Sequence, residues 1–319
     1  MTEARTLEQV QENPMHPDIA ARSVCLNFKI GKLRGRRRVP TAMIQVAAEL
    51  MGVNDKQPDK DLLHVSKSVL ECDTLKEIAS MDGDMSQYIR ARCLPSMLRA
   101  GIYILPVVLL EEVDAKIELY KRERQLLIDH FVDNQYEKIK KQDATRLGPL
   151  YDERDYPPVG EVKRRFYVEN RMFSFDVPKA LKTLKSDLWK REFVKSQEFW
   201  KQNTEAISAL LRDEFAKLVK HLAATLEPGE DGKKKRFYAS TISNLTDWLD
   251  LLKARNLADD ADIAGLAEQA KKLLDGVAVD DIKDDEATRE NIRKEFAGIT
   301  ARAEQLATER PVRAIDLDD

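Results

Sequence analysis

The chain has 319 residues, of which 34% are charged and 43% are hydrophobic, with 12 glycines and 12 prolines. This balance is typical of a folded protein rich in solvent-facing helices, and it excludes a chain that is disordered throughout. The net charge of -3 is too small to mark the whole molecule as a nucleic-acid-binding protein, and the acidic excess lies after Pro228.

The cysteines and the apolar runs indicate in which cellular compartment the protein is expected. Cys25, Cys72 and Cys93 form no Cys-x-x-Cys pair and indicate neither a disulfide framework nor a zinc site. The N-terminus lacks an apolar signal region, and the longest apolar run, Ala100 to Leu110, is about half as long as a membrane helix. We therefore expect a cytoplasmic protein that is neither exported nor membrane-spanning.

A strand and a basic segment follow a polar leader at residues 1–22. Between residues 23 and 30, apolar side chains alternate with the two-residue period of a half-buried strand. The basic segment, residues 29–38, then carries six cations and two glycines; its candidate nucleic-acid-binding residues are Lys29, Lys32, Arg34, Arg36, Arg37 and Arg38. These cations suit phosphate neutralisation. They equally suit a solvated edge that discourages strand-to-strand aggregation.

Helical spacing returns after Pro40. The pattern predicts short helices over residues 41–52, 62–78 and 85–93, with an interruption at Met81 to Asp84 and a stop before Pro95. A long helix is predicted over residues 107–141, because apolar side chains recur at alternating steps of three and four. Its expected interface residues are Leu110, Val113, Ile117, Tyr120, Leu127 and Phe131.

A second strand and a second long helix are predicted next. Residues 165–177 alternate aromatic and polar side chains, and we expect them to pair with residues 23–30. Pro178 opens an apolar helical stripe that continues to Glu227, whose interface residues are Leu181, Leu184, Leu188, Phe199, Ile207, Leu211, Phe215, Leu218 and Leu222. The two long segments are expected to pack as antiparallel partners.

The charged stretch 230–236 is the expected domain boundary. Residues 237–309 contain three helical patterns and are predicted to form an acidic helical unit, followed by an acidic tail at 310–319. The predicted fold class is therefore mainly α. A long antiparallel helical hairpin or coiled coil at residues 23–229 would carry a small two-stranded β element, and the C-terminal helical unit would follow it.

Motifs of the common enzyme classes are missing from the sequence. It contains no phosphate-binding glycine loop, no Gly-x-Ser-x-Gly and no His-Glu-x-x-His. His130 and Asp133 would share a helical face, and Asp152 and Asp155 offer a carboxylate pair in a loop. A solvated helix face and a charged, solubilising loop explain both pairs without chemistry. We therefore expect no catalytic residues, no metal and no cofactor.

Several stretches resemble a domain family of unassigned function found in bacteria and their phages. They are VCLNFKIGKLRGRRRVP, HVSKSVLECDTL and RDYPPVGEVKRRFYVENRMFSFDVP, and the similarity covers roughly residues 23–225. Members of that family are neighbours of MoxR-class AAA+ ATPases and von Willebrand factor A domain proteins. The resemblance implies an adaptor or assembly role, and it carries over no catalytic residue.

These patterns favour a non-catalytic helical scaffold or adaptor of phage or bacterial origin. Long apolar stripes need partners, so we expect protein partners, an AAA+ ATPase assembly among them, and a homo-oligomer. The alternative is a nucleic-acid-binding accessory protein that uses the basic segment.

Overall fold

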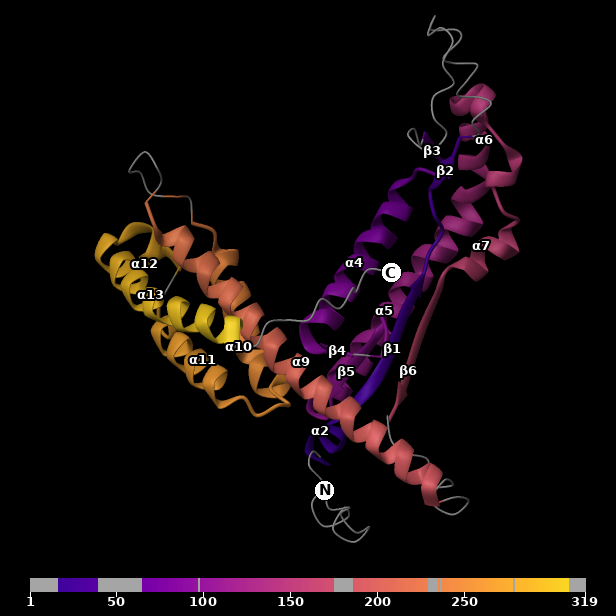
Figure 1. Cartoon of the computed structure of the whole chain (residues 1–319). Coiled ribbons are helices and arrows are strands. Elements are labelled where there is room, and N and C mark those ends of the chain that lie inside the picture. The colour runs from indigo at the N-terminus through magenta and orange to yellow at the C-terminus, as the bar shows by residue number, and fades with distance from the viewer. Residues whose placement is uncertain are drawn as a thin grey trace, which may run out of the picture. The chain divides into compact units, whose positions relative to one another are not determined.

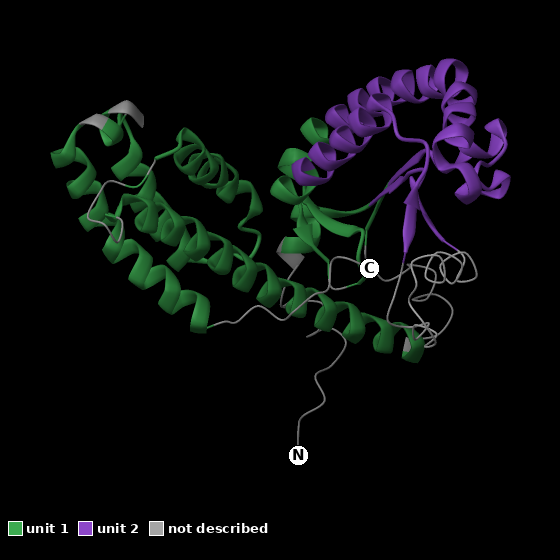
Figure 2. Cartoon of the chain, turned by 90° about the horizontal axis from the view of Figure 1, so that it is seen from above, with its two compact units in different colours: residues 1–27, 89–113, 171–319 green, residues 28–88, 114–170 purple. Residues whose placement is uncertain are grey.

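A computed structural model describes residues 17–39, 65–96, 98–174, 186–228, 235, 237–277 and 279–309. These residues are mostly helical with a small antiparallel sheet, which confirms the predicted fold class at that level (Figure 1). The chain forms two compact units (Figure 2): unit 1 comprises residues 1–27, 89–113 and 171–319, and unit 2 comprises residues 28–88 and 114–170. This division differs from the predicted boundary at residues 230–236.

The larger sheet has the strand order β4-β5-β1-β6. The strands are β4 (Leu94–Pro95), β5 (Ile102–Pro106), β1 (Ser23–Gly31) and β6 (Tyr167–Phe173). β6 lies beside β1, which confirms the predicted pairing. The expectation of only two strands is wrong, because β5 runs antiparallel to the other side of β1, with Cys25 opposite Ile104. The five residues of β5 lie within the apolar run before the long helix.

Unit 2 contains a second, two-stranded sheet of β2 (Arg36–Arg38) and β3 (Ser66–Ser68). Within the helix predicted over residues 62–78, residues 66–68 form β3 instead, so that prediction is wrong there. Leu70 explains the change: its φ of 57° is incompatible with a right-handed helix, and its backbone N donates to Asp143. The helix predicted over 41–52 lies outside the described residues.

Helix α4 (Asp73–Arg92) runs without a break through the predicted interruption at Met81 to Asp84, so that prediction is wrong. Asp82 is only 5% exposed and accepts hydrogen bonds from the Arg124 Nε and the Tyr120 hydroxyl, each at 2.7 Å. Arg124 also donates to the Gly31 carbonyl. These tertiary contacts outweigh the weak helix propensity of the Asp-Gly sequence.

The predicted long helix is present, but it changes type along its length. A 3-10 turn (Val107–Leu109) leads into α5 (Leu110–His130), a π-helical turn (Phe131–Gln135) and α6 (Tyr136–Leu147). The expected interface residues point into the chain's own interior: Val113, Ile117, Tyr120 and Phe131 are buried, and Leu110 and Leu127 are half-buried. α7 (Val159–Arg165) completes unit 2.

Unit 1 contains α2 (Pro17–Arg22), α9 (Ser186–Leu226), α10 (Ala239–Arg255), α11 (Ala261–Leu274), α12 (Val279–Asp284) and α13 (Glu286–Glu309). α9 makes its most extensive contacts with α13. Phe215 of α9, Leu245 of α10 and Phe296 of α13 belong to one apolar cluster. Residues 237–309 therefore share a core with α9 and are not a separate unit.

Most of the described interface residues predicted in α9 belong to this core or pack against it. Ile207, Leu211, Phe215 and Leu222 are buried, and Leu188, Phe199 and Leu218 are half-buried. Leu181, Leu184 and the predicted tail lie outside the described residues. Since α9 uses its apolar stripe against α13, a hairpin between the two long segments is not confirmed.

Candidate functional site

The basic segment forms the end of β1, a turn and β2. Five of its six cations are exposed: Lys29, Lys32, Arg34, Arg36 and Arg38. Leu33 lies between two of them with 8% exposure and packs into the apolar cluster of unit 2. The backbone is thus seated through an apolar side chain while the charged side chains reach solvent.

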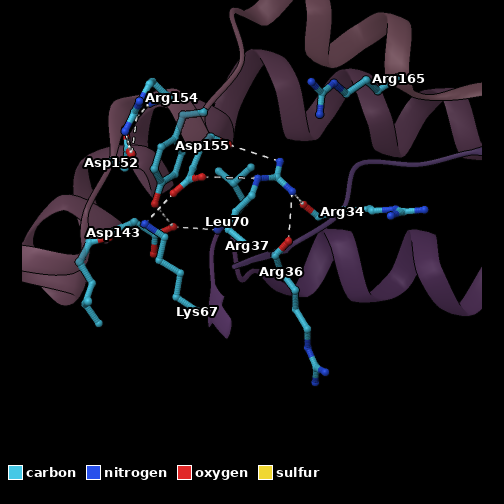
Figure 3. A network of polar contacts seen from close by, with 12 residues as sticks. Arg34, Arg36, Arg37, Lys67, Leu70, Asp143, Asp152, Arg154, Asp155 and Arg165 are labelled. Atoms are coloured by element: carbon cyan, nitrogen blue, oxygen red, sulfur yellow. Dashed lines mark hydrogen bonds and ion pairs between the residues drawn. The ribbon is translucent and has the colours of Figure 1, made fainter. Parts of the chain in front are cut away.

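Arg37 differs from the other cations of the segment because it is turned inward (Figure 3). Its Nη1 donates to the carbonyls of Arg34 and Arg36 at 2.8 and 3.2 Å, and its Nη2 donates to the Asp155 carbonyl at 3.4 Å. Its Nε lies 3.8 Å from the Asp155 Oδ1. Arg37, predicted to bind phosphate, therefore anchors β2 to the rest of unit 2.

Lys67 lies opposite Arg37 in the antiparallel pair β2–β3 and shares its anion. Its side chain is 5% exposed, and its Nζ is 2.7 Å from the Asp155 Oδ2 and donates to the Leu150 carbonyl at 2.5 Å. Asp155 therefore balances two cations from two strands, as Figure 3 shows. A buried ammonium needs such a partner, because removing it from water is costly.

Asp143 is the second carboxylate of this network, and it is buried, at 2% exposure. Its Oδ2 accepts from the Leu70 backbone N at 2.7 Å and from the Tyr156 hydroxyl at 3.0 Å, and its Oδ1 accepts from the Arg146 Nη2 at 2.7 Å. Burial, and then this hydrogen bond, raise the pKa of Tyr156. Helix α6 and the loop after it are thereby tied to the segment that follows β3.

The predicted carboxylate pair Asp152 and Asp155 divides between two partners. Asp152 pairs with Arg154 at 2.7 Å, and the hydrogen bonds from that residue lower the pKa of Asp152 to about 2. Asp155 forms ion pairs with Arg37 and Lys67. A general acid needs a proton near neutral pH, which Asp152 does not hold. This geometry favours a structural role for both.

The five exposed cations of the basic segment make no hydrogen bond or ion pair within the part of the chain that the structure describes. Elsewhere in unit 2 many cations have an acidic neighbour; Arg146 contacts Asp143 and Glu71, and Lys140 contacts Glu153. The basic segment thus places five exposed cations that pair with no described acidic side chain within ten consecutive residues. We call these five side chains the basic strip.

Residues that sequence reasoning missed extend the basic strip. A Cβ atom on Gly31 would overlap the Tyr167 ring and lie 2.8 Å from the Arg165 carbonyl, so the end of α7 and the start of β6 lie directly beside the strip. Arg164 is exposed there, Lys163 is exposed but pairs with Asp133, and Tyr167 is 42% exposed. The sequence feature that could have identified these residues is the run Lys163 to Tyr167, in which three cations precede two aromatic residues.

A second candidate is an open pocket of about 730 Å³ between the start of α4 and the π-helical turn. Cys72, His130 and Gln135 line it, and the His130 Nε2 lies 3.0 Å from the Gln135 Nε2. Burial raises the pKa of Cys72, which disfavours a reactive thiolate. Asp133, predicted to share a face with His130, pairs with Lys163 at 3.0 Å. Across the described ranges, no three side chains form a metal-binding group.

Comparisons with known proteins do not assign this chain to a family. Searches find no matching family model, no matching curated protein and no matching solved structure. Separately, none of the described helices combines the length and the apolar character needed to cross a membrane.

Proposed function

We propose that unit 2 is a non-catalytic module that binds nucleic acid through the basic strip. The observation that carries the proposal is the uncompensated charge of Lys29, Lys32, Arg34, Arg36 and Arg38 on the end of β1, the turn and β2. Cations that neutralise phosphates release condensed counterions, and this release provides most of the affinity for a polyanion.

The anchoring of β2 favours a ligand-binding role for the basic strip over a role in solubility alone. A solvated edge needs only charge, whereas β2 is fixed by Arg37 and by its pairing with β3, which Lys67 in turn fastens to Asp155. Fixed backbone lowers the entropy lost when the neighbouring side chains engage a ligand. Arg36 and Arg38 flank Arg37, so the anchor holds two exposed cations on the opposite side of the strand.

The test is fluorescence anisotropy with labelled oligonucleotides over a range of salt concentrations. The triple variant Arg34→Gln/Arg36→Gln/Arg38→Gln should bind at least about tenfold more weakly at low salt and show a flatter salt dependence, by about one unit of slope per lost phosphate contact. The matched control, Arg191→Gln/Lys217→Gln/Lys272→Gln, removes the same charge from exposed positions of unit 1 and should bind like the parent chain. No binding by the parent chain, or equal binding by both triple variants, would contradict the proposal.

A scaffold or adaptor function is the second candidate, and one observation favours it. Leu119 and Leu126 lie seven residues apart on the outer face of α5 and are 38% and 71% exposed. This spacing is that of a coiled-coil seam, so the stripe suits a partner helix. A second copy of the chain is one candidate partner. An AAA+ ATPase in the cytoplasm of a bacterium, encoded by that bacterium or by its phage, is the other, through the family resemblance.

Light scattering over a concentration series tests this second function. Self-association should appear as a rising average mass, and Leu119→Ser/Leu126→Ser should abolish it with an unchanged circular dichroism spectrum. Pull-down with a purified AAA+ ATPase tests the other partner. A chain that stays monomeric at high concentration and captures no ATPase would remove the scaffold hypothesis.

A further inference from the structure

Tyr167 is an exposed aromatic side chain set among cations. It opens the edge strand β6, directly after α7, whose last turn is Lys163-Arg164-Arg165. Its ring lies against Gly31, and Lys29 and Lys32 are exposed on either side of that glycine. One π surface is therefore framed by positive charge from two segments that are far apart in sequence.

We infer that the ligand of the basic strip is single-stranded nucleic acid, with an unpaired base stacked on the Tyr167 ring. The inference rests on the proposed nucleic-acid-binding function and specifies its substrate class. Proteins that bind single strands combine a basic surface for the phosphates with aromatic side chains on which bases stack. The bases of a duplex are stacked on one another, so an exposed ring adds little to duplex binding.

The ring is held in place by its surroundings. Phe166, the preceding residue, is 7% exposed, and its ring packs edge-on against Phe131 at 6.3 Å between centroids. The Arg124 guanidinium lies 5.5 Å from the Phe166 ring centroid. With Phe166 fixed in the core of unit 2, Tyr167 faces outward, and the missing side chain of Gly31 makes room for its ring.

The electrostatic surroundings fit a strand that passes over the ring. Arg165 is half-buried and pairs with Glu161 at 2.5 Å, so it is partly neutralised. Lys32, Arg34 and Arg164 are exposed and make no ion pair with the described residues. Phosphates on both sides of a stacked base thus meet cations from the basic strip and from α7.

The experiment compares a labelled single strand of about 15 nucleotides with a duplex of the same sequence. The parent chain should bind the single strand about tenfold more tightly than the duplex, and Tyr167→Leu should lose about tenfold for the single strand while duplex binding changes less than about twofold. Tyr167→Phe keeps the π surface and should bind like the parent chain. Tyr238→Leu, at a 54% exposed tyrosine of unit 1, is the matched control and should change neither affinity.

Gly31→Ala provides a second variant, because the added Cβ displaces the ring without removing it; it should weaken single-strand binding in the same way. Circular dichroism and thermal melting establish that each variant is folded. Equal affinity for the two ligands, together with unchanged binding by Tyr167→Leu, would overturn the single-strand inference and leave the proposed function standing. Failure of the parent chain to bind either ligand would overturn both.

Discussion

Two carboxylates, the buried Asp143 and the half-buried Asp155, organise the polar side chains of unit 2. Asp143 accepts hydrogen bonds from several donors, and Asp155 forms ion pairs with Arg37 and Lys67. These partners belong to segments far apart in sequence: Arg37 lies 118 residues before Asp155, and Leu70 lies 73 residues before Asp143. Charged groups taken out of water stabilise a fold only when they are fully paired. At the residue scale, we therefore expect a few acidic side chains to make large contributions to the stability of this region.

Replacing Asp155 tests this arrangement. Asp155→Asn leaves the Lys67 ammonium, whose side chain is 5% exposed, without a counter-charge, and should lower the free energy of unfolding by about 3 kcal/mol in urea denaturation. Asp152→Asn is the matched control in the same loop; it loses only the partner of Arg154, whose side chain is 88% exposed, and should have a much smaller effect. Equal effects would show that Asp155 does not compensate Lys67.

Tyr136 makes the free energy of unfolding depend on pH in the alkaline range. Burial raises the pKa of Tyr136 from 10.0 to about 12, and its hydroxyl donates to the Pro157 carbonyl. Because the folded-state pKa is the higher one, the contribution of Tyr136 is complete below about pH 10 and is lost as the pH rises towards 12. Urea unfolding of the parent chain between about pH 8 and pH 11.5 should show this loss, and Tyr136→Phe should reduce it. Parallel pH profiles would contradict the assignment.

At the scale of elements, the continuity of α4 depends on a contact with α5. Asp-Gly favours a turn, yet Asp82 and Gly83 lie within a regular helix because Asp82 receives hydrogen bonds from Arg124 and Tyr120. The π-helical turn between α5 and α6 is a second local irregularity, and its residue Phe131 is fully buried in the core of unit 2. In α4 a long-range contact thus overrides a local turn signal, and at the π-helical turn the irregular backbone carries a buried core residue.

Breaking the contact between α4 and α5 should be costly. Asp82→Ala leaves the 2% exposed Arg124 buried without its carboxylate, and we expect a loss of about 3 to 5 kcal/mol in urea denaturation. The double variant Asp82→Leu/Arg124→Met replaces the pair by apolar side chains and should recover most of that loss. Asp84→Ala changes an exposed position of the same helix and should be nearly neutral. A neutral Asp82→Ala would show that α4 needs no such contact.

At the scale of the whole molecule, each unit has its own apolar cluster. The cluster around Phe215 and Phe296 draws all its members from unit 1, and the cluster around Phe131 and Tyr136 draws all its members from unit 2. The chain enters unit 2 twice, at residues 28–88 and 114–170. Because each unit has a separate core, a substitution that destabilises one core should destabilise mainly the elements packed around it.

Hydrogen exchange can measure that separation. Phe296→Ala removes a fully buried ring, and the cavity should cost unit 1 about 3 to 5 kcal/mol. Amide protection should therefore fall in α9, α10, α11 and α13 and persist in α6 and α7. Glu295→Ala, at the exposed neighbouring position, should leave both patterns unchanged. A loss of protection that spread equally to α6 and α7 would mean that the two cores unfold as one.

The sequence by itself determined the features that depend on local periodicity. The alternation of Val24, Leu26, Phe28 and Ile30 predicted β1, the three-and-four spacing predicted α5 and α9 together with their buried faces, and aromatic alternation predicted β6. These patterns recur every two or 3.6 residues, so a short window of sequence contains them.

Tertiary structure alone decided how those elements are used. The inward turn of Arg37 depends on Asp155, the continuity of α4 depends on Arg124, and the position of Tyr167 depends on a missing side chain at Gly31. The core that α9 shares with α13 likewise removed the predicted boundary at residues 230–236. Each depends on contacts between residues distant in the chain, and periodicity carries no information about which distant residues meet.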